Sequence, residues 1–426
     1  MQTSLLGIAK KAKSDKRYRF RNLYRELNEE LLLDSWRLLR KDAALGVDRV
    51  SAAEYETNLE ENIHQLVERL KRKSYRAKLV RRHYIPKGNG GMRPLGIPAT
   101  EDKLLQLAVK RLLEAIYEQD FLSCSYGYRP QVGARTAVDE LDKKLQFGGY
   151  HHVVEADIKG FFDNLSHEWL MRMLAERVDD EPFLRLIKKW LNAGVLDTNG
   201  KVLRPESGTP QGGIISPLLA NVYLHYALDL WFERVFQRSS RGASFLHRYA
   251  DDFVCGFQRE EDAQRFYGEL EERLQKFGLE LAKDKTRVIP FSRYRQGETS
   301  FEFLGFEFRW GVDRKGRARL KRRTARKKLR NSVNRVAEWC KQHHHRRVKE
   351  QFQLLNAKLR GYYNYYGVIG NYASLDEFFY HVRRLHLKWL NRRSQRRSYT
   401  WVGYGELLRR FALERPHIVS RPRVSL

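Results

Sequence analysis

Two adjacent acids, Asp251 and Asp252, stand between two apolar runs, Phe245–Tyr249 before them and Phe253–Phe257 after them. Apolar runs that flank a short acidic turn predict a β-hairpin with both carboxylates at its tip. Neighbouring carboxylates repel each other, so a tip that presents two of them favours a bound cation. Oxygen ligands of this kind suit Mg²⁺. The pair therefore indicates a candidate metal site, although a single Asp-Asp pair is usually a solvated turn.

A second acidic strand end strengthens the metal interpretation. The run Val153–Ile158 is apolar and carries Asp157, which lies 94 positions before Asp251. Helices and strands between the two would form the crossover that brings both strands into one sheet. Three carboxylates from two strand ends could then hold two metal ions, an arrangement that serves the making of phosphodiester bonds.

The charge balance indicates a polyanionic partner. Lys and Arg number 81 against 52 Asp and Glu, a formal net charge of +29 over 426 residues, which favours nucleic acid. No long apolar segment or lipidation signal supports a membrane role, and the N-terminus is too short in apolar residues for a secretory signal. The three cysteines are far apart, which predicts neither disulfides nor a zinc knuckle and fits a reducing, cytoplasmic setting.

Other segments suggest nucleotide contacts. Residues 84–98 predict a strand, a glycine-rich turn and a second strand, with Lys87 and Arg93 beside the turn; a phosphate grip and an ordinary charged hairpin fit equally well. Phe162 follows Asp157 by five residues and could close a pocket or simply pack in the core. The loop at 208–214 has glycines that permit close approach to a ligand. Residues 301–308 alternate with period two, which predicts one half-buried strand.

The C-terminal part is basic and aromatic. Residues 314–330 hold 11 Lys or Arg and no acid. A run with charges of one sign would repel itself, so it favours contact with a polyanion over a solvated helix face. The block Gly361–Gly367 is rich in tyrosine, which can stack on bases or fill a helical core; the two alternatives are balanced. The predicted RNA-binding residues are Arg322, Arg323, Arg326, Lys327, Tyr362 and Tyr363.

The order of these motifs resembles bacterial group II intron-encoded reverse transcriptases, also called intron maturases. The resemblance runs from about Phe20 to the C-terminus. It rests on the segments 85–87 with 93–95, 125–130, 156–163, 209–221, 248–253, 303–306 and 359–366.

The resemblance implies an α+β fold, a right-hand polymerase. Fingers and palm, an antiparallel sheet flanked by helices, would span residues 1–312. A helical thumb or maturase (X) domain would span 313–400, and a basic tail 401–426. The implied activity is RNA-directed DNA synthesis, together with binding of group II intron RNA to assist splicing and retrohoming. The implied partners are that RNA, an RNA template with DNA primer, dNTPs and target DNA.

Site roles also follow from the resemblance. Asp157, Asp251 and Asp252, with the Ile158 carbonyl, would hold two Mg²⁺ ions, and Lys285 would protonate the departing pyrophosphate. The expected dNTP contacts are Lys87, Arg93, Ile158, Phe162 and Gln211. The Phe162 ring would act as a steric gate against the ribose 2′-hydroxyl, and residues 303–308 would form the primer grip.

The chain departs from longer family members because no zinc-type cysteine pairs or His-Asn-His endonuclease pattern follow the maturase segment, so second-strand cleavage is not expected. Two alternatives stay open: a domesticated relative used in defence or repair, and a non-enzymatic splicing cofactor. The three intact acids disfavour the second. The bulky Phe162 disfavours an RNA-templated RNA polymerase.

Overall fold

The computed structural model describes residues 2–86, 91–295, 297, 299–393 and 398–419. The chain divides into two compact units, residues 1–137 with 150–288, and residues 138–149 with 289–426. Helices and mostly antiparallel sheets occur together, so the α+β prediction is confirmed. The predicted boundary at 312 differs from this division, because the strands that follow residue 299 pair with one another and not with the first unit's sheets.

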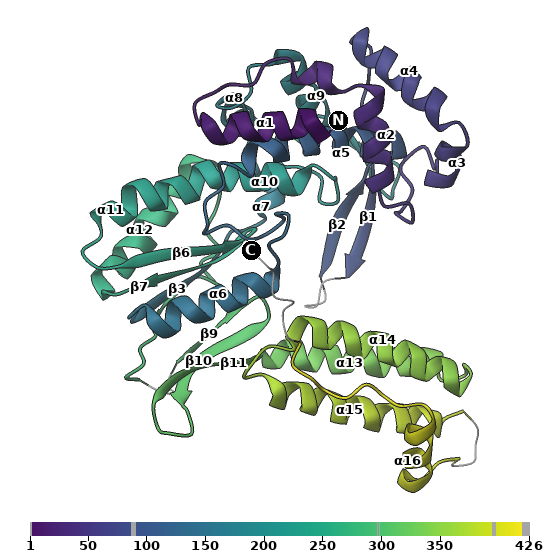
Figure 1. Ribbon diagram of the computed structural model, residues 1–426, viewed down its shortest axis with the longest axis vertical. Helices are drawn as coiled ribbons and strands as arrows, with labels where there is room; N and C mark the ends of the chain where they lie inside the picture. Colours follow the sequence, from purple (N-terminus) through teal and green to yellow (C-terminus); the bar gives the residue numbers. More distant parts are fainter. Residues whose placement is uncertain (1, 87–90, 296, 298, 394–397, 420–426) are drawn as a thin grey trace. The chain divides into compact units, whose positions relative to one another are not determined.

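The first unit is built on two four-stranded sheets, in the orders β2-β1-β4-β5 and β6-β7-β3-β8. Figure 1 labels β1 and β2 of the first sheet and β3, β6 and β7 of the second. The strands are β1 (Val80–Pro86), β2 (Met92–Ile97), β3 (His152–Asp157), β4 (Val195–Leu196), β5 (Val202–Leu203), β6 (Ser244–Tyr249), β7 (Asp252–Phe257) and β8 (Arg287–Pro290). The predicted hairpin of residues 84–98 is confirmed as β1 and β2, an antiparallel pair.

Helices surround these sheets. They are α1 (Gln2–Ser14), α2 (Glu29–Leu38), α3 (Ala52–Thr57), α4 (Leu59–Lys71), α5 (Thr100–Tyr117), α7 (Phe161–Asn164), α8 (His167–Ala175), α9 (Glu181–Leu191), α10 (Ser216–Leu224), α11 (Gln237–Ser239) and α12 (Glu260–Lys276), with the 3₁₀-helix η1 (Leu23–Glu26). Helix α5 buries apolar side chains along most of its length, and α12 packs across β3 and β7 (Figure 1). The core of this unit therefore lies between the helices and the sheet that carries the predicted acids.

The helix that starts at Ser216 contains two π-helical segments, η2 (His225–Asp229) and η3 (Phe232–Phe236). In η2 the N–H of Leu230 donates to the carbonyl of His225, five residues back. A π-helical turn inserts an extra residue and so rotates the side chains that follow it. Asp229, the last residue of η2, is fully buried.

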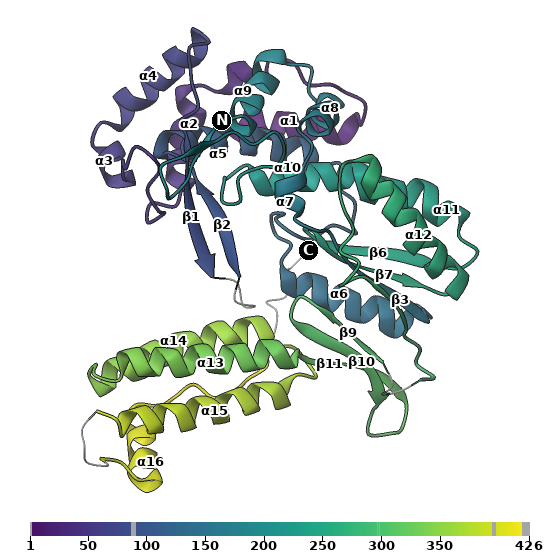
Figure 2. The same ribbon diagram turned by 180° about the vertical axis from the view of Figure 1, so that it is seen from behind.

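The second unit joins a small sheet to a helical bundle (Figure 2). Its elements are β9 (Ser300–Phe303), β10 (Phe306–Val312), β11 (Ala318–Thr324), α13 (Arg326–His343), α14 (Val348–Tyr366), α15 (Tyr372–Leu390) and α16 (Trp401–Arg410), and α6 (Ala134–Phe147) contributes most of its length. Helices α13 and α15 pack closely. The predicted tail at 401–426 is in part helical, and its Tyr404 is buried in the bundle core.

The single strand predicted at 301–308 is wrong, because the segment is a hairpin. Leu304 (φ +50°) and Gly305 (φ +79°) form a two-residue turn, and Phe303 pairs with Phe306 across it. Two left-handed residues give the turn twist that suits antiparallel strands. The alternation of Phe and Glu persists on both sides of the turn, so periodicity alone did not reveal the reversal.

Candidate active site

The three predicted acids meet at one end of the β6-β7-β3-β8 sheet. Asp157, the last residue of β3, lies directly opposite Asp252, the first residue of β7. Asp251 occupies the two-residue turn between β6 and β7, because Tyr249 pairs with Asp252. The predicted acidic hairpin tip is thus confirmed, and so is its adjacency to the Asp157 strand.

The turn has a constrained backbone. Ala250, its first residue, is left-handed with φ +57°, a conformation that is unfavourable for residues other than glycine. Such conformations persist only where the surroundings hold them, and they cluster at functional sites. The contacts around the turn therefore determine where the acids point.

The Arg248 side chain supplies a hydrogen bond to the backbone of the turn. Its side chain is fully buried, and Nη1 donates to the carbonyl oxygen of Ala250 at 3.0 Å. Nε and Nη2 donate to the two carboxylate oxygens of Asp229 at 2.7 and 2.5 Å. Nη1 also donates to Asn221 Oδ1 at 3.1 Å, and Nη2 to Ser125 Oγ at 2.8 Å. One guanidinium thus joins the turn, the π-helical segment η2, helix α10 and the loop at 125.

The loop at 125–130 supports the turn from another side. A Cβ at Gly127 would lie 2.4 Å from the backbone nitrogen of Ala250, so only glycine permits this approach. Asn221 Nδ2 donates to the Gly127 carbonyl at 2.6 Å. The segments 125–130, 209–221 and 248–252, which sequence reasoning treated as separate motifs, therefore form one support for the acids.

Electrostatics within the site show that the acids are close. Burial raises the pKa of Asp251, and the Asp157 carboxylate raises it further, while Arg93 and Arg248 oppose the shift. Lys285 Nζ lies 2.5 Å from Asp157 Oδ2, and this hydrogen bond raises the lysine pKa. A cation thus already accompanies one of the three carboxylates.

The donor set matches a hard divalent cation in type and place, since carboxylates converge at one sheet end and their charges interact. Among the described residues, however, no group of three or more His, Cys, Asp or Glu has the arrangement of a finished metal site. The Asp157 carboxylate binds Lys285 instead. A metal ion that binds Asp157 would therefore have to compete with Lys285 for this carboxylate.

Most of the predicted nucleotide contacts lie around this sheet end. Phe162 is half-buried in α7, and its carbonyl accepts the Thr209 N–H at 2.8 Å, which ties it to the loop of Gln211. The Gln211 carbonyl accepts the Gly96 N–H of β2 at 2.6 Å.

Arg93 is exposed on β2, and Ile158 is buried directly after Asp157. Lys87 lies outside the described residues.

Three of the predicted RNA contacts are wrong as surface contacts. Arg322 is 8% exposed and pairs with Asp139 at 2.7 Å. Tyr362 and Tyr363 are 8% and 0% exposed, and the Tyr362 ring stacks on Phe378 with centroids 3.8 Å apart. Neither tyrosine ring has a free face for a base, so core packing holds for these two residues, whereas Tyr365 of the same block is 39% exposed.

The other three RNA-binding predictions differ among themselves. Arg323 is half-buried and forms two hydrogen bonds with Glu307, at 3.0 and 2.7 Å, so its charge is compensated. Arg326 and Lys327 are exposed in the first turn of α13 and have no ion pair with the part of the chain that the structure describes. These two stay predictions.

Sequence reasoning missed the support of the turn. Arg248 was read only as part of the frame around the acids, although a charged residue inside an otherwise apolar strand signals a buried ion pair. Nothing in the sequence identified Asp229 as its partner. The two residues are 19 positions apart, and the carboxylate comes from the last residue of the π-helical segment η2.

Two facing acids and an acidic hairpin turn meet at one sheet end, which is the arrangement expected of a polymerase palm. Residues 85–308 match the model of the reverse transcriptase (RNA-dependent DNA polymerase) family. The chain is 31% identical to the group II intron-encoded protein LtrA of Lactococcus lactis subsp. cremoris, over 75% of this chain and 66% of LtrA. It is 32% identical to protein YkfC of Escherichia coli (strain K12), over 67% of this chain and 81% of YkfC.

The chain therefore belongs to the reverse transcriptase family, and its resemblance to group II intron-encoded members is confirmed. It spans about two thirds of the length of LtrA. Within the described ranges, no helix combines the length and the apolar character that crossing a bilayer needs.

Proposed function

We propose that this protein is an RNA-directed DNA polymerase that extends a DNA primer on an RNA template. The carrying observation is the pairing of Asp157 with Asp252 beside the half-buried Asp251, at a turn whose Ala250 carbonyl accepts from Arg248. Two Mg²⁺ ions bound by these acids and the Ile158 carbonyl would supply activation of the primer 3′-hydroxyl and charge neutralisation at the triphosphate.

The surrounding residues take the other roles. Arg93, exposed on β2 and close enough to influence the Asp251 pKa, would bind the triphosphate, together with Lys87. Phe162 would exclude the ribose 2′-hydroxyl, since its backbone is tied to the loop of Gln211 that would line the same pocket. Lys285 would leave Asp157 when metal enters and would then protonate pyrophosphate. The β9–β10 hairpin would hold the primer.

The second activity we propose is binding of a group II intron RNA, to assist its splicing and retrohoming. The similarity to LtrA supports it, and so does the net charge of +29. Arg326 and Lys327 are the exposed, uncompensated candidates in the second unit. Target DNA would be the further partner in retrohoming.

The deciding experiment is dNTP incorporation on poly(rA)/oligo(dT) with Mg²⁺, comparing the wild type with Asp251→Ala. The matched control is Glu272→Gln, which removes a charge from an exposed position on α12. Synthesis by the wild type and the control that is lost in Asp251→Ala would support the proposal. A folded wild type without synthesis would overturn it and favour the splicing-cofactor alternative.

A further inference from the structure

A cavity of about 970 Å³ opens on the first unit, and none of the predicted site residues lines it. Three separate segments form its walls: residues 73–79 between α4 and β1, residues 185–194 from α9 onward, and residues 204–206 after β5. Six of its 15 lining residues are Lys or Arg, about twice the proportion in the whole chain, and one is acidic. We call it the basic cavity.

Most of these cations are uncompensated. Lys73, Arg76, Lys188 and Arg204 are exposed, and none forms an ion pair or a side-chain hydrogen bond with the described residues. The other two have partners, since Arg185 pairs with Glu181 and Lys189 Nζ donates to the Tyr75 carbonyl at 2.6 Å. Cations gathered beside a single acid repel one another and raise the local concentration of anions.

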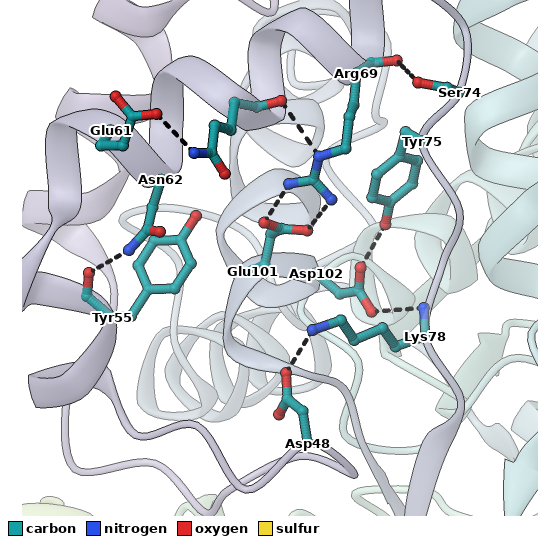
Figure 3. A network of polar contacts seen from close by, with 11 residues as sticks. Asp48, Tyr55, Glu61, Asn62, Arg69, Ser74, Tyr75, Lys78, Glu101 and Asp102 are labelled. Atoms are coloured by element: carbon teal, nitrogen blue, oxygen red, sulfur yellow. Dashed lines mark hydrogen bonds and ion pairs between the residues drawn. The ribbon is translucent and has the colours of Figure 1, made fainter.

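Hydrogen bonds tie the wall at residues 73–79 to its neighbours (Figure 3). Tyr75 is 1% exposed, and its hydroxyl donates to Asp102 Oδ1 at 2.5 Å and accepts from Trp190 Nε1 at 2.8 Å. The Lys78 N–H donates to the other Asp102 oxygen at 3.1 Å. Asp102 thus anchors the segment to α5.

Neighbouring contacts complete this anchor. Arg69 on α4 makes two hydrogen bonds with Glu101, at 3.0 and 2.6 Å, and its carbonyl accepts from the Ser74 hydroxyl at 3.3 Å (Figure 3). Because the backbone of the wall is held on both sides, only the side chains of the cations it carries must be ordered when an anion binds.

The basic cavity is connected to the polymerase site along the chain. Arg204 precedes Gln211 by seven residues, so at most about 25 Å separates their backbones. Between them, the Gly208 N–H donates to the Leu165 carbonyl at 2.7 Å, and the Thr209 N–H donates to the Phe162 carbonyl. A nucleic-acid strand with the phosphate spacing of one strand of a duplex would span this distance with about seven nucleotides.

We propose that the basic cavity binds the phosphodiester backbone of a nucleic-acid strand outside the polymerase site. The inference rests on the proposed function, because a polymerase that holds an RNA template supplies such a strand. Two molecules could supply this phosphodiester backbone: the single-stranded 5′ part of the template, or a separate folded RNA. Cations from three segments favour an extended polyanion over a single small anion, since no one phosphate would contact them all.

The test is a charge reversal with a matched control. The cavity variant carries Arg76→Glu, Lys188→Glu and Arg204→Glu. The control variant carries Arg234→Glu, Arg238→Glu and Lys276→Glu, at exposed positions of the same unit that do not line the cavity. Both change the net charge equally, and thermal unfolding checks that both fold.

Binding is measured by fluorescence anisotropy without dNTPs, over a range of salt concentrations. The probes are a primer–template with a 5′ RNA overhang of about two nucleotides, one of about fifteen, and a folded RNA without primer. We expect the cavity variant to lose at least about tenfold in affinity for either the long-overhang primer–template or the folded RNA. The slope of log affinity against log salt concentration should become shallower by about two to three.

Loss confined to the long overhang identifies the template as the source, and loss confined to the folded RNA identifies a separate RNA. Equal loss in both variants for every probe would overturn the proposal, because the effect would then be one of net charge. Since binding is read without synthesis, cavity-dependent binding by a protein that incorporates no dNTP would refute the polymerase function and leave this inference standing.

Discussion

Arg248 and Asp229 form a bidentate ion pair at 2.7 and 2.5 Å in which both side chains are fully buried. The same guanidinium donates to the carbonyl of Ala250, the residue before the acidic pair. Coulombic attraction and hydrogen bonding to Asp229 raise the arginine pKa, against the effect of burial. This pair therefore links the π-helical segment to the turn that carries Asp251.

Asp229→Ala leaves a buried guanidinium without its anion, and we expect a loss of about 3–5 kcal/mol in the free energy of unfolding. The double variant Arg248→Met with Asp229→Leu removes both charges and should recover most of that stability. It should still synthesise DNA at least about tenfold more slowly, because the Ala250 carbonyl loses its donor. Denaturant unfolding and primer extension measure the two effects. Full activity in the double variant would show that the pair serves stability alone.

Gly127→Ala should displace the acidic turn, because the added Cβ would lie 2.4 Å from the Ala250 nitrogen. We expect at least about a hundredfold loss in primer extension, as small displacements of reacting groups are costly. Gly133→Ala is the control, since no atom lies within 4 Å of its Cβ position. Equal activities of the two variants would show that the turn tolerates displacement.

Lys285→Met should lower the Mg²⁺ concentration needed for half-maximal synthesis, because the ammonium group no longer competes for Asp157. The maximal rate should fall about ten- to a hundredfold if Lys285 also protonates pyrophosphate. A magnesium titration of primer extension separates the two effects. Lys283→Met, which breaks only a pair with Glu271, should change neither. A higher magnesium requirement in Lys285→Met would contradict competition.

Phe162→Ala should admit ribonucleotides, since this ring is the half-buried one of the two phenylalanines that open α7 after Asp157. We expect the preference for dNTPs over NTPs, measured as a ratio of kcat/KM values, to fall at least about tenfold. The neighbouring Phe161→Leu removes a fully buried ring, so it should reduce stability without changing this ratio. An unchanged ratio in Phe162→Ala would assign the ring to core packing.

The second unit should lose stability as the pH falls below 6.5. Burial lowers the pKa of His386 to about 3, so the native imidazole stays neutral while the unfolded one takes up a proton. The unfolded state then binds more protons, and at pH 5 this costs about 2 kcal/mol. His386→Leu should flatten the pH dependence of the unfolding midpoint, whereas exposed His345→Gln should not. A parallel pH dependence in the wild type and His386→Leu would refute the assignment.

The sequence by itself determined the fold class, the family and the meeting of the three acids. Local patterns carry that information, because apolar runs that end in acids define strand ends, and strands of one sheet bring their ends together. The resemblance to the family, and not this pattern, assigned Phe162 and Gln211 to one pocket, and the structure ties the Phe162 carbonyl to the Thr209 N–H of the Gln211 loop.

Only the tertiary structure decided which charges are buried and what they contact. The basic run at 314–330 contains both a buried and an exposed arginine. Arg322 pairs with Asp139, 183 residues away in the sequence, whereas Arg326 is exposed. Composition does not distinguish these two arginines. Likewise, Asp229 reaches Arg248 through a π-helical turn, and residues 73–79, 185–194 and 204–206 converge into the basic cavity. Such relations depend on packing between segments distant in sequence, whereas periodicity reports only the face on which a residue lies.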